Sequence, residues 1–406
     1  MADGCSDWAL PELSFHTPLE VAEHPHLDRV AREGVCGLLD PIAPGVPAGS
    51  DTSHLALFGY DPFEDYCNRG PYEALGVGID LKPGDIAFRV NLGTVDENGV
   101  LIDRRAGRID TTSARRLLTD VVAAVQEQAP IEFVLRHATE HRAALVLRGE
   151  GLSPLVADTD PHRVGVPVPP PRPLSDDPAA KRTADALQQL LSLIHHQLRN
   201  HPINKQRKAE GKLPANTLLL RGAGLFRPLP SFYDKWGLRA CCVGATALIL
   251  GVARAAGMDV ITPPGATGSA DTDLLAKARA VVNALQNHDF VYLHFKATDS
   301  ASHDHKPWLK IELLRRFDQA IGYILDHTDP NNTIVVVTAD HTTSSVLGEH
   351  TGDPTPLAVL HSYVVKDDVR RFTERECAKG ALGRFAARYL MNHITNWMGI
   401  AHKVGA

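Results

Sequence analysis

The sequence predicts an α/β protein: a mostly parallel sheet sandwiched by helices, with an α+β domain inserted into it. Short β-rich runs alternate with helical segments in the second half of the chain, as expected for parallel strands covered by helices. Residues 67–227 differ, with hairpin-like runs followed by a proline cluster at 166–178. We therefore expect one discontinuous domain, 1–66 with 228–406, and an inserted domain, 67–227.

The second half supplies the strands of the predicted sheet. Its β-rich runs are residues 259–265, 289–295, 333–340 and 357–365. Between the second and third runs lies "KPWLKIELLRRFDQAIGYILDH". Apolar residues recur there at the spacing of one helix face, namely Leu314, Phe317, Ile321 and Ile324.

The front of the chain predicts a helix from about Pro18 to Arg32. Thr17, with Pro18 after it and Glu20 three residues on, is typical of a capping box. In the inserted domain, Glu97-Asn98-Gly99 predicts a hairpin turn. The proline cluster predicts an extended connector, followed by a helix near 179–200.

Composition restricts the function classes. The 406 residues are 44% hydrophobic and 22% charged, with a net charge of −6, so no general attraction to nucleic acid or anionic membranes is expected. No apolar run approaches the roughly 20 residues of a membrane span. The start, "MADGCSDW", lacks the basic and apolar regions of a signal peptide. The cysteines form no CxxC pair, which favours reduced thiols in a cytoplasmic protein; they are Cys5, Cys36, Cys67, Cys241, Cys242 and Cys377.

Carboxylate and imidazole side chains follow two neighbouring predicted strands. Asp340 is the last residue of "TIVVVTAD", and His341 follows it. Asp299 and His303 follow "DFVYLHF". Ligands bind beyond the carboxyl ends of parallel strands, so these pairs should share one edge. A single Asp-His pair after a strand is usually a turn carboxylate beside a surface histidine. Two pairs with a further histidine, His350, and a further aspartate, Asp3, suffice for two divalent cations. Such ligands suit Mn²⁺ or Zn²⁺ better than Mg²⁺.

Several motifs resemble cofactor-independent phosphoglycerate mutase of the archaeal type, within the alkaline phosphatase superfamily. They lie in family order over nearly the whole chain: "PAGSDTSHLALFGYDP", "RRAGRI", "EHRAALVLRG", "DTDPH", "ANTLLLRGAG", "PPGATGSADTD", "KATDSASHDH" and "TADHTTSS…HTGDPTP". The resemblance implies an alkaline-phosphatase-like α/β domain that carries an inserted mutase cap.

The resemblance also implies roles for individual residues. Ser50 would be the nucleophile that accepts the phosphoryl group. One metal would be held by Asp3, Asp340, His341 and the Ser50 oxygen, and the other by Asp299, His303 and His350. Mn²⁺ is expected, with Mg²⁺, Co²⁺ or Zn²⁺ as alternatives, and 2,3-bisphosphoglycerate is not required. Metals activate a serine hydroxyl and stabilise the charge of a transferred phosphoryl group.

The inserted domain should hold the phosphorylated substrate. Arginine suits this task because its planar fork binds carboxylate and phosphate through two hydrogen bonds. The candidates are Arg89, Arg104, Arg105, Arg108, His141, Arg142 and Arg221, the last counted with the catalytic residues. Lys235 resembles a family lysine near the phosphoryl group, although an exposed lysine at a helix end explains it equally well. Asn204 and Arg207 match a family pattern without an assigned role.

Two departures from the family pattern matter. Only Met1 and Ala2 precede Asp3, where the family has a full strand. Either the start of the sequence is misassigned, or the sheet loses a strand and Asp3 is poorly anchored. Ser344 and Gly348 stand where the family often has proline and lysine, which predicts a lost basic residue near the phosphate.

The resulting hypothesis is an isomerase that interconverts 3-phosphoglycerate and 2-phosphoglycerate through phospho-Ser50. Its expected partner is a small phosphorylated molecule, with neither nucleic acid nor membrane involved. One alternative is a paralogue that acts on a modified glycerate phosphate or phosphonate, or a phosphatase or kinase-like phosphotransferase. Another alternative is an inactive metal-binding protein.

Overall fold

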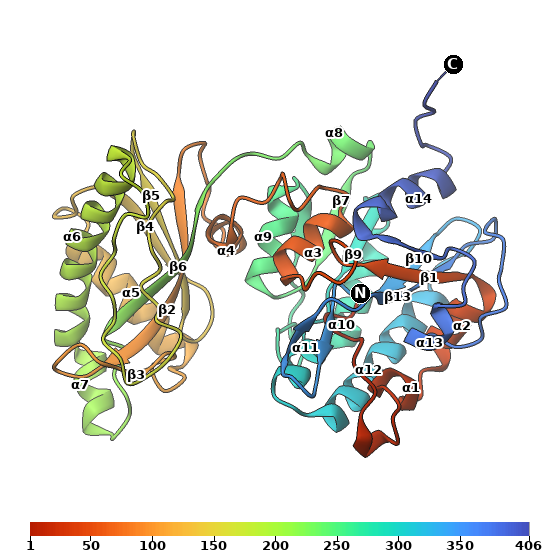
Figure 1. Cartoon of the computed structure of the whole chain (residues 1–406), viewed down its shortest axis with the longest axis horizontal. Helices are drawn as coiled ribbons and strands as arrows, with labels where there is room; N and C mark the ends of the chain where they lie inside the picture. Colours follow the sequence, from red (N-terminus) through yellow and green to blue (C-terminus); the bar gives the residue numbers. More distant parts are fainter. Residues whose placement is uncertain (406) are drawn as a thin grey trace. The chain divides into compact units, whose positions relative to one another are not determined.

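A computed structural model describes residues 1–405, which divide into two compact units. Unit 1 comprises Met1–Tyr66 and the chain from Leu229 onward, and unit 2 comprises Cys67–Pro228. Figure 1 shows both units coloured along the sequence. Among the described residues, no helix combines the length and the apolar character that a membrane span requires.

Unit 1 is an α/β unit with two main sheets. Three parallel strands lie in the order β8-β7-β9, and four further strands in the order β10-β13-β1-β14, in which β13 runs antiparallel to both neighbours. The antiparallel β13 is the exception to the predicted parallel pattern. The strands are β1 (Val35–Asp40), β7 (Ala240–Val243), β8 (Asp259–Ile261), β9 (Phe290–Leu293), β10 (Val335–Thr338), β13 (Thr355–Leu360) and β14 (Arg384–Ala386), with a separate hairpin of β11 (Thr342–Ser344) and β12 (Glu349–Thr351).

The first three residues connect the two sheets. Ala2 forms a parallel bridge with Phe295 beyond β9 and donates its backbone N–H to Thr338 of β10 at 3.3 Å. The Asp3 N–H donates to the Phe295 carbonyl at 2.8 Å. The expectation that Asp3 is poorly anchored is therefore wrong, because the segment pairs with both neighbouring strands and Asp3 is fully buried.

Helices cover both faces of the parallel strands. On one face, Cys241 and Val243 of β7 pack in a core with residues of α10 and α12. On the other face, His54 of α3 and Phe58, the residue that caps this helix, contact the Tyr292 ring. The helices of this unit are η1 (Pro11–Leu13), α1 (Pro18–Val21), α2 (Pro25–Glu33), α3 (Ser50–Leu57), α8 (Phe232–Trp236), α9 (Ala247–Ala255), α10 (Leu274–Ala284), α11 (Ala297–His303), α12 (Pro307–Asp326), α13 (Glu374–Cys377), η2 (Ala387–Tyr389) and α14 (Leu390–Trp397).

The helix predicted from Pro18 to Arg32 is two helices. The capping box at its start is confirmed, because Thr17 and Glu20 each accept the other's backbone N–H, at 3.1 and 2.9 Å. The chain then becomes extended at Ala22 and restarts with Pro25 as the first residue of α2. Proline has no N–H for a continuing helix and fits the first helical position, so it divides the predicted helix. The helix predicted in the second half is α12, and its four apolar residues are buried.

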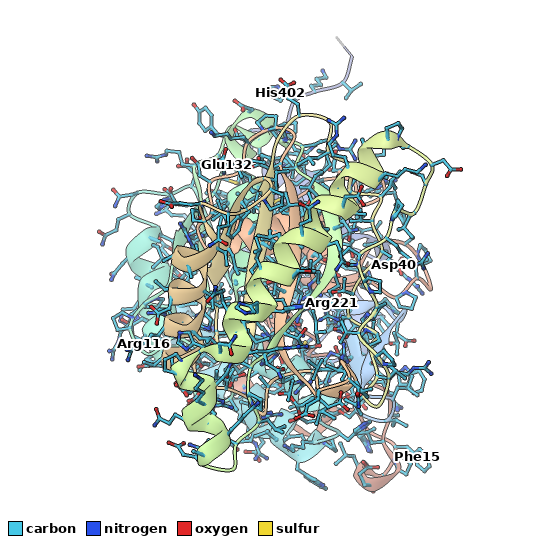
Figure 2. All side chains as sticks on the ribbon, turned by 90° about the vertical axis from the view of Figure 1, so that its left-hand side faces the viewer. Phe15, Asp40, Arg116, Glu132, Arg221 and His402 are labelled. Atoms are coloured by element: carbon cyan, nitrogen blue, oxygen red, sulfur yellow. The ribbon has the colours of Figure 1, made fainter. Side chains whose placement is uncertain are left out.

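Unit 2 is an α+β unit with a five-stranded antiparallel sheet. Strand β2 is central and pairs with β3, β5 and β6, while β4 pairs with β5. Helices α5 and α6 pack on one face in a continuous core, and Figure 2 views the molecule from the side of α6. The elements are α4 (Arg69–Gly76), β2 (Ile86–Val95), β3 (Leu101–Asp103), α5 (Thr111–Val125), β4 (Glu132–His137), β5 (Arg142–Arg148), α6 (Pro178–Asn200), α7 (Pro202–Ala209) and β6 (Thr217–Leu225).

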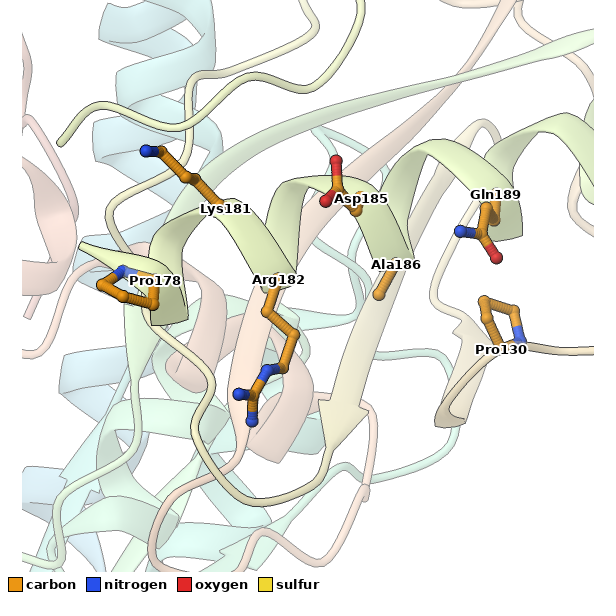
Figure 3. A pocket seen from close by; sticks show the side chains of 7 residues that line it. All are labelled: Pro130, Pro178, Lys181, Arg182, Asp185, Ala186 and Gln189. Carbon is orange, nitrogen blue, oxygen red and sulfur yellow. The ribbon is translucent and has the colours of Figure 1, made fainter. Parts of the chain in front are cut away.

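Two local predictions in unit 2 are confirmed. Asp96 accepts from the Gly99 N–H at 3.2 Å and donates to Val100 at 3.0 Å, and Gly99 has φ +77°, so the hairpin turn lies where Asn-Gly predicts it. Helix α6 begins within a residue of the predicted position. A groove of about 550 Å³ lies along the start of α6 (Figure 3); it is lined by Pro130, Pro178, Lys181, Arg182, Asp185, Ala186 and Gln189. It contains none of the predicted site residues.

Candidate active site

Unit 1 brings six predicted ligands together as two groups of three. In each group the potential ligand atoms lie within 4.8 Å of one another. We call Asp3, Asp340 and His341 the buried triad, and Asp299, His303 and His350 the rim triad. Asp340 and His341 directly follow β10, Asp299 and His303 lie on α11 just after β9, and His350 lies on β12.

The buried triad has no exposed side chain. His341 Nε2 lies 3.1 Å from Asp340 Oδ2 and 3.6 Å from Asp3 Oδ1. The other oxygen of each aspartate is already held, because His294 lies 2.9 Å from Asp3 Oδ2 and the Gly4 N–H donates to Asp340 Oδ1 at 3.0 Å. Asp340 Oδ2 is buried and makes no aligned hydrogen bond, although His341 Nε2 lies 3.1 Å away. Unpaired buried carboxylate oxygens are costly, so this geometry suits a bound cation.

The rim triad is partly exposed and has the same chemistry. Asp299 Oδ1 lies 3.4 Å from His303 Nε2 and 3.2 Å from His350 Nε2. The Nδ1 atoms of these rings lie 2.5 and 2.7 Å from the carbonyls of Gly348 and Ala48. With Nδ1–H donating to a carbonyl, a neutral imidazole keeps its Nε2 lone pair free for a metal. Both triads therefore fit divalent cations.

Thr343 connects the two triads. Its hydroxyl lies 2.8 Å from Asp299 Oδ1 and 3.1 Å from His341 Nδ1. The backbone carbonyl of the same residue accepts from the buried Lys310 ammonium at 3.1 Å. One side chain on β11 thus orients a ligand from each triad.

Ser50 lies at the start of α3, within reach of the buried triad. Its Oγ is 3.1 Å from His341 Nε2, and its side chain is almost buried. Gly49 before it is extended, and the Ser53 N–H donates to the Gly49 carbonyl at 3.0 Å, which begins the helix. Ser50 is thus placed beside the predicted ligands, as a nucleophile of a metal-assisted transfer requires.

Lys296 is the residue of this site that sequence reasoning missed. Its ammonium lies 2.7 Å from Asp299 Oδ2, 3.0 Å from Asp3 Oδ1 and 3.4 Å from Ser50 Oγ. Its position three residues before Asp299, on the same helical turn, was the available signal, but the strand register that brings Asp3 alongside is not visible in the sequence.

Burial and like charges perturb the ionisable groups. Burial and the neighbouring Asp340 raise the pKa of Asp3 to about 6. Burial also opposes ionisation of Asp299, but the Lys296 charge and the hydrogen bonds from His303 and His350 together outweigh it and hold the pKa well below its usual range. The hydrogen bond that His303 donates to Asp299 raises the pKa of His303 to about 8. Crowded carboxylates of this kind favour the binding of cations.

In unit 2, the sheet brings arginines to one face. Arg89 of β2 lies opposite Arg221 of β6, and Asn91 of β2 lies opposite Arg142 at the start of β5. Apolar residues of β2 that alternate with these pack in the α5–α6 core, so the arginines occupy the other face. This face is a candidate anion-binding surface.

A buried carboxylate of α4 accompanies these arginines. Glu73 Oε1 lies 3.0 Å from Arg69 Nε and 3.6 Å from Arg89 Nε. Burial opposes its ionisation, but the charges of Arg89 and Arg69 lower its pKa. Sequence reasoning missed both α4 residues because no motif marks them. We call Arg69, Arg89, Arg142 and Arg221 with Glu73 the arginine cluster.

The other predicted residues of unit 2 have varied surroundings. His141 is buried, and burial together with Arg142 and Arg105 lowers its pKa to about 3. Arg104 forms two hydrogen bonds with Asp160, at 2.9 and 2.7 Å. Arg105 and Arg108 are exposed, and the Arg108 guanidinium has no hydrogen-bond partner among the described residues.

The sequence assigned no definite role to Asn204, Arg207 and Lys235, and their contacts can now be described. Asn204 bonds to the Leu198 and Ala215 carbonyls, and Arg207 to those of Leu213 and Ala106. Both therefore connect α7 to the end of α6 and to neighbouring loops. Lys235 of α8 lies 5.2 Å from the centre of the Tyr60 ring, near the end of α3 opposite Ser50.

The two positions that depart from the family pattern are also explained locally. Ser344 is buried in β11. Gly348 has φ +68°, and His305 lies so close that a Cβ would meet its ring at 2.7 Å. Both features favour glycine at position 348. A basic residue is still present near Ser50, because the Lys296 ammonium lies 3.4 Å from its Oγ.

The fold and the site define an enzyme that transfers phosphoryl groups. Residues 31–204 match the family described as 2,3-bisphosphoglycerate-independent phosphoglycerate mutase, and residues 252–393 match Type I phosphodiesterase / nucleotide pyrophosphatase. A 2,3-bisphosphoglycerate-independent phosphoglycerate mutase from Ignicoccus hospitalis is 48% identical, over 100% of this chain and 98% of the relative. The enzyme of the same name from Pyrococcus horikoshii is 47% identical, over 100% of this chain and 97% of the relative. The chain belongs to the family of 2,3-bisphosphoglycerate-independent phosphoglycerate mutases, which are isomerases.

Solved structures agree with this assignment. A structure of a Pyrococcus horikoshii protein is 40% identical with a TM-score of 0.87, covering 100% of this chain and 98% of that one. A cofactor-independent phosphoglycerate mutase from Thermoplasma acidophilum is 34% identical with a TM-score of 0.71, covering 98% of each chain. The two-unit fold is therefore that of the family.

Proposed function

We propose that this protein interconverts 3-phosphoglycerate and 2-phosphoglycerate through a phosphorylated Ser50, without 2,3-bisphosphoglycerate. The observation that carries the proposal is the position of Ser50 Oγ, 3.1 Å from His341 Nε2 and beside both triads. The curated relatives are named phosphoglycerate mutases, which supports phosphoglycerate as the substrate. Those names do not favour a phosphatase or a kinase-like enzyme.

The transfer takes place in two balanced steps. Ser50 Oγ forms a bond to phosphorus while the bond between phosphorus and the glycerate oxygen breaks, with its electron pair on that oxygen. Ser50 loses one proton and the glycerate oxygen gains one. In the second step, the other glycerate hydroxyl attacks phosphorus, the bond to Ser50 breaks, and the proton returns to Ser50. The donor and the product therefore differ only in which hydroxyl carries the phosphate.

Two divalent metals fit the triads. Asp3, Asp340 and His341 with Ser50 would hold one, and Asp299, His303 and His350 the other; we propose Mn²⁺ for this carboxylate and imidazole set. When bound, metals activate the serine hydroxyl and stabilise charge on the transferred group. The chain's own contribution is to orient these ligands through Thr343, His294 and the backbone carbonyls.

The arginine cluster of unit 2 is proposed to bind the anionic substrate. Arg89 is buried and Arg221 is half-buried, and the buried Nε atom of each has no hydrogen-bond partner. Buried donors of this kind are ready for a carboxylate or phosphate. Keeping the glycerate bound favours transfer over hydrolysis, because a held reactant has a high effective concentration.

The decisive experiment replaces Ser50 by alanine. We expect the mutase rate to fall roughly 10⁴-fold or more, as for the loss of other enzyme nucleophiles, while the circular dichroism and the manganese content stay close to wild type. Ser53→Ala, one turn further along α3, is the matched control. Phosphorylated Ser50 should be detectable by mass spectrometry in the wild-type enzyme after quenching. Wild-type turnover by Ser50→Ala would exclude the mechanism.

Metal removal tests the second part of the proposal. Exhaustive chelation should abolish turnover of 3-phosphoglycerate in an enolase-coupled assay, and added Mn²⁺ should restore it. Full activity after chelation would contradict the assignment of the triads. We also propose a glycolytic role in the cytoplasm, in accord with six cysteines that are all buried and form no disulfide.

A further inference from the structure

We propose that Lys296 is a catalytic residue whose ammonium binds the phosphoryl group carried by Ser50. The inference deepens the proposed function and rests on it. It begins from the position of the Lys296 ammonium, which touches one carboxylate of each triad and lies 3.4 Å from Ser50 Oγ. The same hydroxyl lies 3.1 Å from His341 Nε2 of the buried triad.

The contact with Asp299 is compatible with a metal in the rim triad. Asp299 Oδ1 is the oxygen that faces His303 and His350, at 3.4 and 3.2 Å. Lys296 contacts the other oxygen, Oδ2, at 2.7 Å. A cation held by Oδ1 and the two imidazoles would therefore leave the lysine in place.

At Asp3, in contrast, Lys296 contacts the same oxygen that a metal would need. Lys296 contacts Asp3 Oδ1 at 3.0 Å, and this oxygen also faces His341 of the buried triad. The second oxygen is taken by His294. A cation in the buried triad would compete with Lys296 for Oδ1. An ammonium has three donors, so the competition frees one of them beside Ser50.

A phosphoryl group on Ser50 would provide the acceptor for that donor. Its terminal oxygens are negatively charged and surround the serine oxygen that Lys296 already approaches. The lysine side chain is 21% exposed, whereas the side chains of Asp3 and Asp299 are 0% and 2% exposed, so the lysine is partly accessible and the two aspartates are not. It would hold the group both before and after each transfer and offset its charge.

A second lysine nearby shows what a purely structural role looks like. Lys310 is fully buried and donates to three protein oxygens at 2.9 to 3.1 Å: those of Ser6, Asp7 and Thr343. None of its donors is directed to the reacting atoms. Lys296 is partly exposed and makes its longest contact with the nucleophile, which distinguishes its role.

The test separates anion binding from metal binding in Lys296→Met. The variant is loaded with Mn²⁺, its metal content is measured, and its affinity for inorganic phosphate is determined by calorimetry. We expect two metals per chain, a phosphate affinity roughly 10- to 100-fold below wild type, as for a lost hydrogen bond to a charged group, and a similarly slower formation of phospho-Ser50. Lys306→Met, at an exposed position on the surface, should behave as wild type.

Other outcomes overturn the proposal. Unchanged phosphate affinity with two metals bound would show that Lys296 does not touch the phosphoryl group. A loss of phosphate affinity that follows only the loss of metal would assign it to the support of the metal ligands. If Lys296→Met does not fold, Lys296→Gln, which keeps a donor for Asp299, undergoes the same measurements. Failure of the proposed function is a distinct result, because wild-type enzyme would then contain no phospho-Ser50.

Discussion

The two units organise charge in opposite ways. In unit 1, three carboxylates gather at the sheet edge, and Lys296 lies within 3.0 Å of Asp3 and 2.7 Å of Asp299. In unit 2, four arginines gather on a sheet face around one carboxylate, Glu73, which lies 3.0 Å from Arg69 Nε and 3.6 Å from Arg89 Nε. Lys296 in the first cluster and Glu73 in the second are thus of opposite charge to the residues around them.

The difference shows what each cluster can bind. Like charges held close together in a partly buried place raise the free energy of the folded state. One ammonium does not neutralise three carboxylates, and one carboxylate does not neutralise four arginines. The first cluster therefore favours additional cations and the second favours anions.

The largest expected effect distinguishes a charge that supports the fold from one that serves the site. Lys310→Met removes the fully buried ammonium that pairs with Asp7 at 2.9 Å. An isolated buried carboxylate is strongly unfavourable, so the free energy of unfolding should fall by about 3–5 kcal/mol. Denaturant unfolding of the metal-free protein measures this change.

The double variant Asp7→Asn with Lys310→Met is its control. It removes both charges together, and its loss of stability should be smaller than the sum of the two single losses. If the loss in the double variant equalled the sum of the two single losses, the two charges would not be coupled. Unit 1 would then tolerate an unpaired buried charge better than expected.

The next effect concerns the balancing charge of unit 2. Glu73→Gln leaves the largely buried Arg89 without its counter-charge, but the amide keeps a hydrogen-bond acceptor. We expect a loss of about 2–3 kcal/mol of stability, below that of Lys310→Met. Inorganic phosphate should then raise the melting temperature of this variant more than that of wild type, because the cluster has become more positive.

The exposed Glu132 of β4 is a suitable control for Glu73. Its side chain is 65% exposed, so Glu132→Gln should leave both stability and the phosphate response near wild type. If phosphate stabilised Glu73→Gln and wild type to the same extent, the arginine cluster would not be the anion-binding site of unit 2.

Much of the site could be predicted from the sequence because its ligands follow strands. The pairs Asp340-His341 and Asp299 with His303 are local patterns, and parallel strands end at one edge. Lys296 and Glu73 could not be predicted, since their partners depend on register and packing between distant segments. Asp3 shows the same limit, because its anchoring depends on backbone pairing of Ala2 and Asp3 with Phe295 and Thr338, which no local pattern indicates.

The fold shows a similar division. The helix α12 and the capping box at Thr17 are local features and were predicted. The direction of β13 was not, because a β-rich run does not indicate whether its neighbours are parallel. The break before Pro25 could have been inferred, since proline within a helical pattern commonly ends the helix at the preceding residue.

A smaller effect tests whether the carboxylate cluster acts as one entity. Thr343→Val removes the hydroxyl that lies 2.8 Å from Asp299 Oδ1 and 3.1 Å from His341 Nδ1. Loss of such a supporting contact commonly lowers metal affinity about 10- to 100-fold, and here we expect it to affect both metals. Competition with a fluorescent chelator measures the Mn²⁺ affinity. Thr343→Ser keeps the hydroxyl and should retain most of the Mn²⁺ affinity. If Thr343→Val bound Mn²⁺ as tightly as wild type, Thr343 would not couple the two triads.

The smallest effect distinguishes two arginines that the sequence made equivalent candidates for the glycerate clamp. Arg142 is exposed but lies opposite Asn91, within electrostatic reach of Glu73 and Arg89. Arg108 lies on an exposed turn, and its guanidinium has no partner among the described residues. If the cluster holds glycerate while Ser50 carries the phosphate, Arg142→Ala should let glycerate leave before the return transfer, and water should then accept the phosphoryl group. An exposed charged contact contributes about 1 kcal/mol, so the ratio of inorganic phosphate to 2-phosphoglycerate should rise roughly fivefold in Arg142→Ala and stay unchanged in Arg108→Ala. Both products are measured in the same reaction. An unchanged ratio in Arg142→Ala would mean that this arginine does not retain the glycerate, and a rise in Arg108→Ala would move the clamp to the exposed turn.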